Sequence, residues 1–354
     1  MAAALVATLS GCGPSEADSR GAAGARTDAR PVVVCTVPML ADLVERVAGE
    51  AFDVRTLLGR GVDPHLYTPT TSDIIDCKEA AAVFYVGLRL EGALADDLSG
   101  LSKRQAHVVA VGDALPPERL IRLGEAAGED DAHPGEFDPH VWMDVSLWAE
   151  TLPSIVQTLS ALEPSRADEF AANGESLRRT LDRLHRYVLD AVETVPAERR
   201  ILISSHDAFA YFGRAYGVRV QGVQGVSTES EAGVRDIENL VKTLRETGLG
   251  TVFTETSTSN KQIDALVEAA RSEGLEVKAT GDLYSDSTGP EGTWPGTYLG
   301  MVDHNTTMLV TNLGGTVPDG GFRGLMDNGD AATVEAGSAE AGSAEAGSAE
   351  AGGL

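Results

Sequence analysis

The sequence has few basic residues for its length, and this shortage limits the partners that it can bind. Its 354 residues include 54 acidic but only 28 basic side chains, which gives a formal net charge of −26. Nucleic acids and anionic membrane surfaces would repel such a chain, so we expect neither as a direct partner. Apolar runs are short as well, and because none reaches about 18 residues we predict no membrane-spanning helix.

Cysteine is scarce, and the spacing of the three that occur excludes two common kinds of site. Cys12, Cys35 and Cys77 fit neither a zinc ribbon nor a Cys-x-x-Cys redox motif. We expect Cys35 and Cys77 to be small buried apolar side chains, although an oxidising compartment would also allow a disulfide between them. The sequence also lacks a His-Glu-x-x-His motif and a nucleophile elbow, which argues against the familiar hydrolase sites.

Cys12 has a specific interpretation because of the residues that precede it. The run from Met1 to Leu9 is small and apolar, and it leads into Ser10-Gly11-Cys12. This arrangement resembles a bacterial lipobox, in which the cysteine becomes the acylated N-terminus after cleavage. The run is short and no Lys or Arg precedes it, so an ordinary N-terminal segment is the alternative. We interpret residues 1–30 as a lipoprotein signal followed by a flexible tether.

From about residue 31, short apolar runs alternate with helical patterns. Val32 to Val37 is a continuous apolar and β-branched run, typical of a strand buried on both faces, and Pro38 to Val47 has apolar residues at helical spacing. Similar pairs recur along the chain. Alternating strands and helices predict parallel βαβ units, so we expect an α/β protein with two doubly wound parallel-sheet lobes, over residues 31–163 and 196–313.

One long helical pattern separates the two predicted lobes. Residues 164–195 place apolar side chains such as Phe170 and Leu184 close to a 3.6-residue period. At 1.5 Å per residue this helix would span on the order of 45 Å, which is more than one lobe requires, so we interpret it as a strut. Beyond Leu313 the core pattern ends. Repeated Glu-Ala-Gly-Ser-Ala units then predict a disordered acidic tail over residues 314–354.

Three histidines and one aspartate lie where predicted strands give way to loops. His65 and His140 each follow an Asp-Pro pair, His206 precedes a predicted helix, and Asp286 follows the last predicted strand. In open α/β sheets, ligands bind at the carboxyl ends of the strands. Neutral imidazoles with a carboxylate are ligands for a transition metal. We therefore predict one metal site, made by His65, His140, His206 and Asp286, in the cleft between the lobes.

Two further features of this site follow from the sequence. The positive end of the helix expected after His206 would disfavour the charged imidazolium and leave the ring free to bind metal. Glu255 ends a predicted strand nearby, where it would either orient a histidine as a hydrogen-bond acceptor or serve as a structural cap. Trp142 and Tyr284 would shield the site or pack in the core.

Several motifs resemble those of a known family. They are GVDPHLYTPTTSDI, FDPHVWMD, SSHDAFAYF, STESEAG and LYSDSTGPEGTWPGTYLGMVDHN, and they are similar to stretches of the zinc/manganese-type (cluster A-I) substrate-binding proteins of bacterial ABC importers. The resemblance extends from about Val32 to Leu313. It implies two α/β lobes joined by one long helix, with a metal ion in the cleft at the positions of His65, His140, His206 and Asp286.

The resemblance implies a binding protein and not an enzyme. We expect a monomer, lipid-anchored on the extracytoplasmic face of the membrane, that captures a divalent metal and delivers it to an ABC permease and its ATPase. Zn²⁺ is favoured because the third ligand in this family is commonly His in zinc-binding members and Glu in manganese importers, and here it is His206. Mn²⁺ is the alternative, since Asp286 offers an oxygen and residues 124–137 lack a histidine-rich run.

Two functions from other classes are the alternatives to transport. A zinc-dependent hydrolase would also use histidines and a carboxylate, but its metal needs an open coordination position and a nearby general base. Here the fourth position is expected to be filled by Asp286. A surface adhesin is the other alternative, and the acidic tail would suit it.

Overall fold

The computed structural model describes residues 30–104, 107–123, 136–229 and 231–327, and from Pro31 onward these form one compact unit. The interpretations of Cys12, of the N-terminal tether and of the repeats in the tail concern residues outside these ranges. Within them, no helix is long and apolar enough to cross a membrane.

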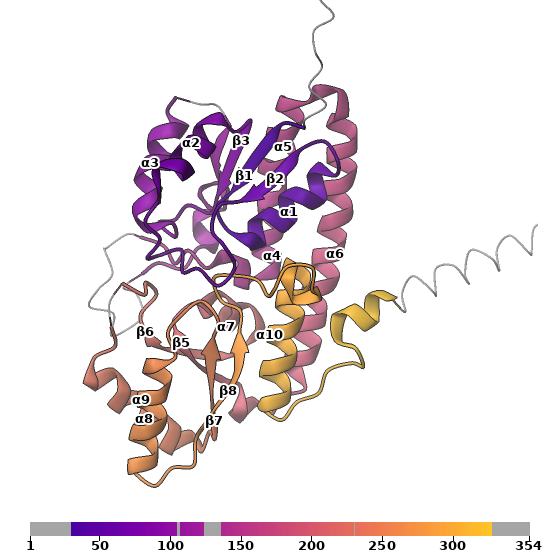
Figure 1. Cartoon of the computed structure of the whole chain (residues 1–354). Coiled ribbons are helices and arrows are strands. Elements are labelled where there is room, and N and C mark those ends of the chain that lie inside the picture. Colours follow the sequence, from indigo (N-terminus) through magenta and orange to yellow (C-terminus); the bar gives the residue numbers. More distant parts are fainter. Residues whose placement is uncertain (1–29, 105–106, 124–135, 230, 328–354) are drawn as a thin grey trace, which may run out of the picture. The chain divides into compact units, whose positions relative to one another are not determined.

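The first group of strands forms a four-stranded parallel sheet in the order β2-β1-β3-β4 (Figure 1). Its strands are β1 (Val32–Cys35), β2 (Asp53–Thr56), β3 (Ala82–Tyr85) and β4 (Val108–Ala110). The helices that alternate with them are α1 (Pro38–Ala48), α2 (Thr71–Glu79) and α3 (Gly92–Ser102). The predicted alternation of strands and helices is therefore present in the first lobe.

Local sequence explains most of the boundaries in this lobe. The central strands β1 and β3 are made almost entirely of buried apolar residues, as expected for strands covered on both faces. Pro38 begins α1, where its missing N–H costs no hydrogen bond. The pattern Thr70-x-x-Asp73 predicts a capping box, and this box begins α2. The side chains of Thr70 and Asp73 each accept a hydrogen bond from the other residue's backbone N–H, at 3.3 and 2.6 Å.

The sequence predicts one helix from Val145 to about Leu162 with Asp144 as its N-cap, but the structure shows that this helix is interrupted. The chain instead forms α4 (Val145–Trp148), a 3₁₀ turn (Ala149–Thr151) and α5 (Leu152–Leu162). Pro153 explains the break because it has no N–H to donate to the preceding turn and can be accommodated only near the start of a helix. The predicted N-cap is confirmed: the Asp144 carboxylate accepts hydrogen bonds from the backbone N–H groups of Ser146 and Leu147.

The predicted strut is confirmed as α6 (Ala167–Glu193), a single helix of 27 residues. It is about 40 Å long at 1.5 Å per residue. One face buries apolar residues such as Phe170, Leu184 and Val188, while charged residues occupy the other. α6 packs against α1 and α5 of the first lobe and against α10 (Tyr298–Asn312) of the second, so it connects the two (Figure 1).

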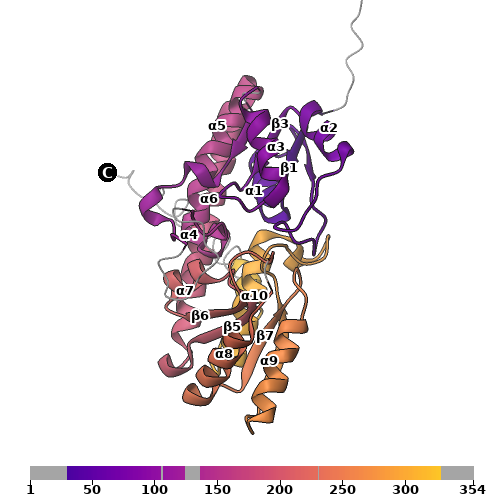
Figure 2. The same ribbon diagram turned by 90° about the vertical axis from the view of Figure 1, so that its left-hand side faces the viewer.

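The second lobe repeats the parallel arrangement with a second set of strands. β5 (Ile201–His206) pairs with β6 (Arg219–Gln224), β7 (Thr251–Glu255) pairs with β8 (Lys278–Leu283), and β5 lies beside β7 (Figure 2). The alternating helices are α7 (Ala210–Tyr216), α8 (Val234–Thr247) and α9 (Lys261–Ser272). The two-lobed α/β fold is as expected, while the bounds assigned to each lobe stay a prediction.

The expectation of disorder from residue 314 is wrong for residues 314–327. Residues 321–327 are helical, and Phe322 is only 1% exposed. Its ring packs 5.6 Å from that of Tyr187 on α6, and its N–H donates to the carboxylate of Asp303 at 2.8 Å. Burying one such ring stabilises the fold by roughly 1.5–3 kcal/mol. A single aromatic residue gives no periodic pattern, which is why the sequence did not indicate this contact.

Cys35 and Cys77 are both buried free thiols, so the disulfide that the sequence left open is not formed. Burial raises the pKa of each, well above its usual range for Cys35 and to about 11 for Cys77. Neither thiol therefore ionises readily, and both act as small apolar side chains in the core.

Candidate metal centre

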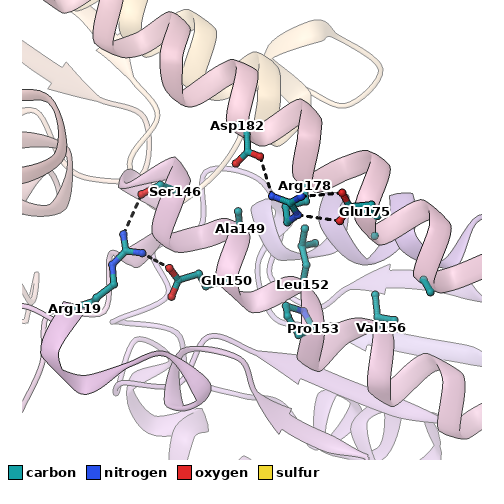
Figure 3. Close-up of a pocket in the computed structure, with 12 residues that line it drawn as sticks. Arg119, Ser146, Ala149, Glu150, Leu152, Pro153, Val156, Glu175, Arg178 and Asp182 are labelled. Atoms are coloured by element: carbon teal, nitrogen blue, oxygen red, sulfur yellow. Dashed lines mark hydrogen bonds and ion pairs between the residues drawn. The ribbon is translucent and has the colours of Figure 1, made fainter.

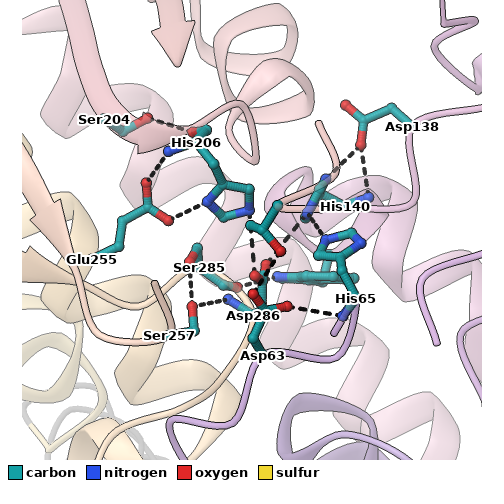
Figure 4. A network of polar contacts seen from close by, with 12 residues as sticks. Asp63, His65, Asp138, His140, Ser204, His206, Glu255, Ser257, Ser285 and Asp286 are labelled. Carbon is teal, nitrogen blue, oxygen red and sulfur yellow. Dashed lines mark hydrogen bonds and ion pairs between the residues drawn. The ribbon is translucent and has the colours of Figure 1, made fainter. Parts of the chain in front are cut away.

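The four predicted ligands converge on one point (Figure 4). His65, His140, His206 and Asp286 each offer one ligand atom, and these atoms lie within 4.8 Å of one another. The Nε2 atoms of His65 and His140 are 3.3 Å apart. The carboxylate of Asp286 lies 3.4 Å from Nε2 of His140 and 3.3 Å from Nε2 of His206. Three of the side chains are fully buried and His65 is 5% exposed, so the centre is largely shielded from solvent.

His65 is held by the loop that follows β2. Pro64 keeps this loop extended, and the backbone N–H of His65 donates to Asp63 Oδ1 at 2.9 Å. The start of α3 supports it from the other side. A Cβ atom at Gly92, whose φ is +45°, would lie only 2.3 Å from the carbonyl oxygen of His65. Only glycine lets the start of α3 approach the backbone of His65 this closely, so Gly92 limits how far the His65 loop can move away from the centre.

His140 does not follow a strand, contrary to our expectation. It lies in a loop well beyond β4 and immediately before a 3₁₀ turn at Val141–Met143. Its orientation comes from Asp138, whose Oδ1 accepts hydrogen bonds from both the backbone N–H and the ring Nδ1 of His140, each at 2.8 Å. This short-range contact turns Nε2 toward the other ligands without any contribution from the sheet.

His206 is the last residue of β5, and Glu255 ends the neighbouring strand β7. Glu255 accepts a hydrogen bond from the His206 ring Nδ1 at 2.6 Å and another from its backbone N–H at 2.9 Å. Both carboxylate oxygens of Glu255 thus bind one histidine, which supports the orienting role over that of a cap alone. As with Asp138 and His140, a buried carboxylate fixes the ring and leaves Nε2 directed inward (Figure 4).

The helix-dipole argument for His206 is wrong. α7 begins only at Ala210 and is short, so its N-terminus does not act directly on the ring. Burial lowers the pKa of His206, but the nearby carboxylates of Glu255 and Asp286 outweigh burial and raise the pKa well above its usual range. The ring of His206 is therefore influenced mainly by two negative carboxylates, and not by the positive end of a helix.

Asp286 is positioned by two serines that sequence reasoning missed. Its backbone N–H donates to Ser257 Oγ at 3.4 Å, and Ser257 Oγ is hydrogen-bonded to Ser285 Oγ at 2.7 Å. The carbonyl of Ser285 accepts a hydrogen bond from the indole of Trp142 at 2.8 Å. Trp142 is fully buried against the His140 ring, so it both packs in the core and shields the site. Ser285 belongs to one of the family-like motifs, but no local pattern connects it with Ser257, which lies in a different segment of the chain.

The electrostatics of the four side chains differ from one ligand to the next. Burial lowers the pKa of His65 to about 3, so its ring is neutral. Burial also opposes protonation of His140, but Asp138 and Asp286 outweigh it and raise the pKa of His140 to about 9. Burial acts to raise the pKa of Asp286, yet His206 and His140 hold it well below its usual range. The site therefore combines one neutral imidazole with two that favour a proton and one firmly ionised carboxylate.

Several buried atoms of the centre lack a conventional hydrogen bond. Within the described residues, Nε2 of His206 and both oxygens of Asp286 have no partner in good hydrogen-bond geometry. Buried polar atoms are normally satisfied, and an unsatisfied carboxylate in the interior is costly. These atoms all face the common centre. A cation among them would satisfy every one, and three imidazole nitrogens with one carboxylate suit a transition metal.

A hollow of about 540 Å³ lies elsewhere, between α4, α5 and α6 (Figure 3). Its charged side chains bind one another: Arg178 pairs with Glu175 and Asp182, and Arg119 pairs with Glu150. None of the four converging ligands lines this hollow, so it is not part of the candidate metal centre.

Comparison with known proteins shows the family of this chain. The family described as "Zinc-uptake complex component A periplasmic" matches residues 33–312. The chain is 40% identical over 293 residues to the zinc-binding protein TroA of Treponema pallidum, covering 83% of this chain and 92% of TroA. It is 39% identical over 315 residues to the manganese-binding lipoprotein MntA of Bacillus subtilis, covering 88% and 98%.

Two further comparisons extend the likeness to structure and to transport. The solved structure of the periplasmic zinc-binding protein TroA superposes with a TM-score of 0.75, covering 80% of this chain and 99% of TroA. A manganese ABC transporter substrate-binding lipoprotein, PsaA of Streptococcus pneumoniae, is 27% identical over 286 residues. The chain thus belongs to the zinc-uptake complex component A family, the zinc/manganese-type substrate-binding proteins that its motifs indicated.

Proposed function

We propose that this protein captures a divalent transition metal, with Zn²⁺ favoured over Mn²⁺, and delivers it to an ABC permease and its ATPase. The observation that carries the proposal is the buried convergence of His65, His140, His206 and Asp286, whose inward atoms include several without hydrogen bonds. Two of these ligands precede the long helix α6 in the sequence, and the other two follow it. The relatives named above as metal-binding proteins and as an ABC transporter component support the same function.

The residue types in the ligand set favour zinc. In a tetrahedron the distance between two ligand atoms is about 1.6 times the bond length, so Zn–N bonds of about 2.0–2.1 Å require ligand atoms about 3.3 Å apart. The Nε2 atoms of His65 and His140 are 3.3 Å apart, and Nε2 of His140 and Nε2 of His206 lie 3.4 and 3.3 Å from different oxygens of Asp286. The four ligand atoms as a set lie within 4.8 Å of one another, so the site has the size that a transition metal needs. Three imidazoles also suit zinc better than manganese, which prefers oxygen ligands. Manganese stays the alternative because relatives of nearly equal identity are named for each metal.

The same geometry favours transport over catalysis. A catalytic zinc keeps one position for water or substrate, whereas Asp286 here completes a set of four protein ligands. A closed shell holds the ion without activating a water molecule. The family is one of transport binding proteins and not of enzymes, so the hydrolase alternative has no support.

Metal uptake by cells distinguishes the two ions. Deleting the gene should impair growth under zinc starvation, and re-expression should restore growth and cellular zinc, measured by elemental analysis. Tighter zinc binding in vitro would prove little, because divalent affinities follow a general order that places zinc above manganese. Restoration confined to manganese starvation would overturn the assignment of zinc. Failure to restore either metal would overturn the proposed transport.

Metal affinity should rise with pH between about 6 and 9. His140, with a pKa raised to about 9, and His206, with a pKa raised well above its usual range, hold protons at neutral pH that an incoming ion must displace. Each displaced proton strengthens binding by up to about tenfold per pH unit. Chelator competition at several pH values measures the slope, and calorimetry in buffers of different ionisation enthalpy counts the protons. Affinity independent of pH would contradict these protonation states.

A lipid anchor at Cys12 is part of the proposal. The lipobox-like residues before Cys12 and the lipoprotein names of MntA and PsaA support it. Labelled fatty acid should enter the protein expressed in bacteria and should not enter the Cys12→Ala variant. Equal labelling of both proteins would reject Cys12 as the acylated residue.

A further inference from the structure

Arg60 and Gly61, which lie between β2 and His65, form polar contacts with residues 287–296 of the second lobe. The guanidinium Nη1 of Arg60 is hydrogen-bonded to Thr288 Oγ1, to the carbonyl of Gly289 at 3.1 Å and to that of Gly296 at 2.9 Å. The next residue, Gly61, donates its backbone N–H to Ser287 Oγ at 2.9 Å. These contacts join parts of the chain that are more than two hundred residues apart.

The segment between β2 and His65 is connected to ligands on both sides of the centre. On its own side, Asp63 accepts the backbone hydrogen bond of His65 through Oδ1, while its Oδ2 accepts one from Thr228 of the second lobe at 2.6 Å. On the opposite side, Ser287 and Thr288 directly follow the ligand Asp286. The contacts of Arg60 therefore lie beside the metal ligands without involving any of them.

The loop that receives Arg60 is already fixed by its own contacts. The N–H of Gly289 donates to the carbonyl of Pro295 at 2.7 Å, and the indole of Trp294 donates to Asp303 on α10 at 2.8 Å. Ser287 and Thr288 are buried. The acceptors for Arg60 are thus held in place before it binds, so little ordering is needed to form the contact.

We propose that Arg60 is a latch between the lobes that sets how fast the bound metal leaves. This inference rests on the proposed metal-binding function. His65 and His140 belong to one lobe and His206 and Asp286 to the other, so release requires that the two pairs separate. Any such separation must first break the contacts of Arg60. Because Arg60 touches no ligand, it acts as a positioning residue: its loss should speed dissociation and leave the coordination unchanged.

The experiment measures metal release from the full-length protein. Protein loaded with zinc is mixed with excess chromogenic chelator in a stopped-flow instrument, and protein loaded with Co²⁺ gives an absorption spectrum that reports the ligand set. For Arg60→Ala we expect roughly tenfold faster release, with unchanged stoichiometry and an unchanged Co²⁺ spectrum. Arg60 is exposed, so the substitution removes no core packing.

Matched variants make the result specific. Arg55→Ala removes another exposed arginine nearby, whose side chain pairs with Asp53 and with no other described residue, and this variant should release zinc at the wild-type rate. Thr288→Val removes one acceptor and should speed release less than Arg60→Ala, because two carbonyl acceptors remain. If the two residues act through one contact, the double variant should release zinc no faster than Arg60→Ala alone.

Two kinds of outcome would overturn the latch. Release from Arg60→Ala at the wild-type rate, or equal acceleration in Arg55→Ala, would overturn it while leaving the metal-binding function intact. A changed Co²⁺ spectrum in Arg60→Ala would also overturn it, since Arg60 would then shape the coordination itself. A wild-type protein that takes up no metal would overturn the proposed function and the latch together.

Discussion

Replacing His65 with alanine should lower zinc affinity by at least about a hundredfold while the protein stays folded. The substitution removes one of four ligands, and no other described side chain in the centre is positioned to replace it. Even residues that only orient a ligand typically cost 10–100-fold when mutated, so losing a ligand should cost more. We expect the same loss of affinity for His206→Ala and for His140→Ala. Asp286→Ala should also remove the carboxylate beside the Nε2 atoms of His140 and His206.

Metal content after dialysis and chelator competition measure these losses, and circular dichroism checks the fold. His304→Ala is the matched control. His304 belongs to one of the family-like motifs, but it is not one of the four converging ligands: it is half-buried, and its ring contacts Tyr284 and the carbonyl of Asp282, the latter at 3.0 Å. We expect this variant to bind zinc as the wild type does. Unchanged affinity in His65→Ala or in His206→Ala would remove that residue from the site.

Local sequence patterns predicted the parts of this protein that depend on neighbouring residues. The apolar run of β1, the capping box of α2 and the apolar face of α6 are each formed within one segment, so each was visible in the sequence. The Asp-Pro-His triplets are equally local. In both, the aspartate accepts a hydrogen bond from the backbone N–H of the histidine two residues later, which explains why the same three residues occur twice.

Contacts between distant segments were not predictable in the same way. Glu91 is fully buried and accepts hydrogen bonds from Thr36 at the end of β1 and from the backbone of Val86 and Gly87 after β3. Burial raises its pKa to about 7, against the opposing effect of these hydrogen bonds. The next residue, Gly92, lies against the backbone of His65. Nothing in the residues around Glu91 indicates that the chain folds back onto a metal ligand there.

The two carboxylate–histidine pairs of the metal centre show the same difference between contacts of neighbouring residues and contacts of distant segments. Asp138 orients His140 from two residues away, whereas Glu255 orients His206 from a different strand. In both pairs the carboxylate accepts hydrogen bonds from the ring Nδ1 and the backbone N–H of the histidine, through one oxygen of Asp138 and through both oxygens of Glu255. Only the first could be inferred from spacing, and for Glu255 the sequence left a structural cap as an equal alternative. The arrangement of β5 beside β7 is what brings Glu255 to the ring.

Replacing Glu255 with alanine should lower zinc affinity by about 10–100-fold through its effect on His206. The substitution leaves the ring Nδ1 and backbone N–H of His206 without their acceptor in a buried place, so the ring is no longer held with Nε2 toward the metal. Glu255→Gln should cost less. Its amide oxygen can still accept one of the two hydrogen bonds, while its NH₂ group must face the other donor.

A double variant separates this orienting role from a purely structural one. If Glu255 acts only through His206, then Glu255→Ala combined with His206→Ala should bind zinc no more weakly than His206→Ala alone. Glu246→Gln is the control, since this exposed glutamate on α8 pairs, within the described part of the chain, with Lys242 alone; the zinc affinity of this variant should not change. Chelator competition gives each affinity and thermal unfolding gives each stability. A Glu255→Ala protein that is less stable but binds zinc normally would show that Glu255 only caps its strand.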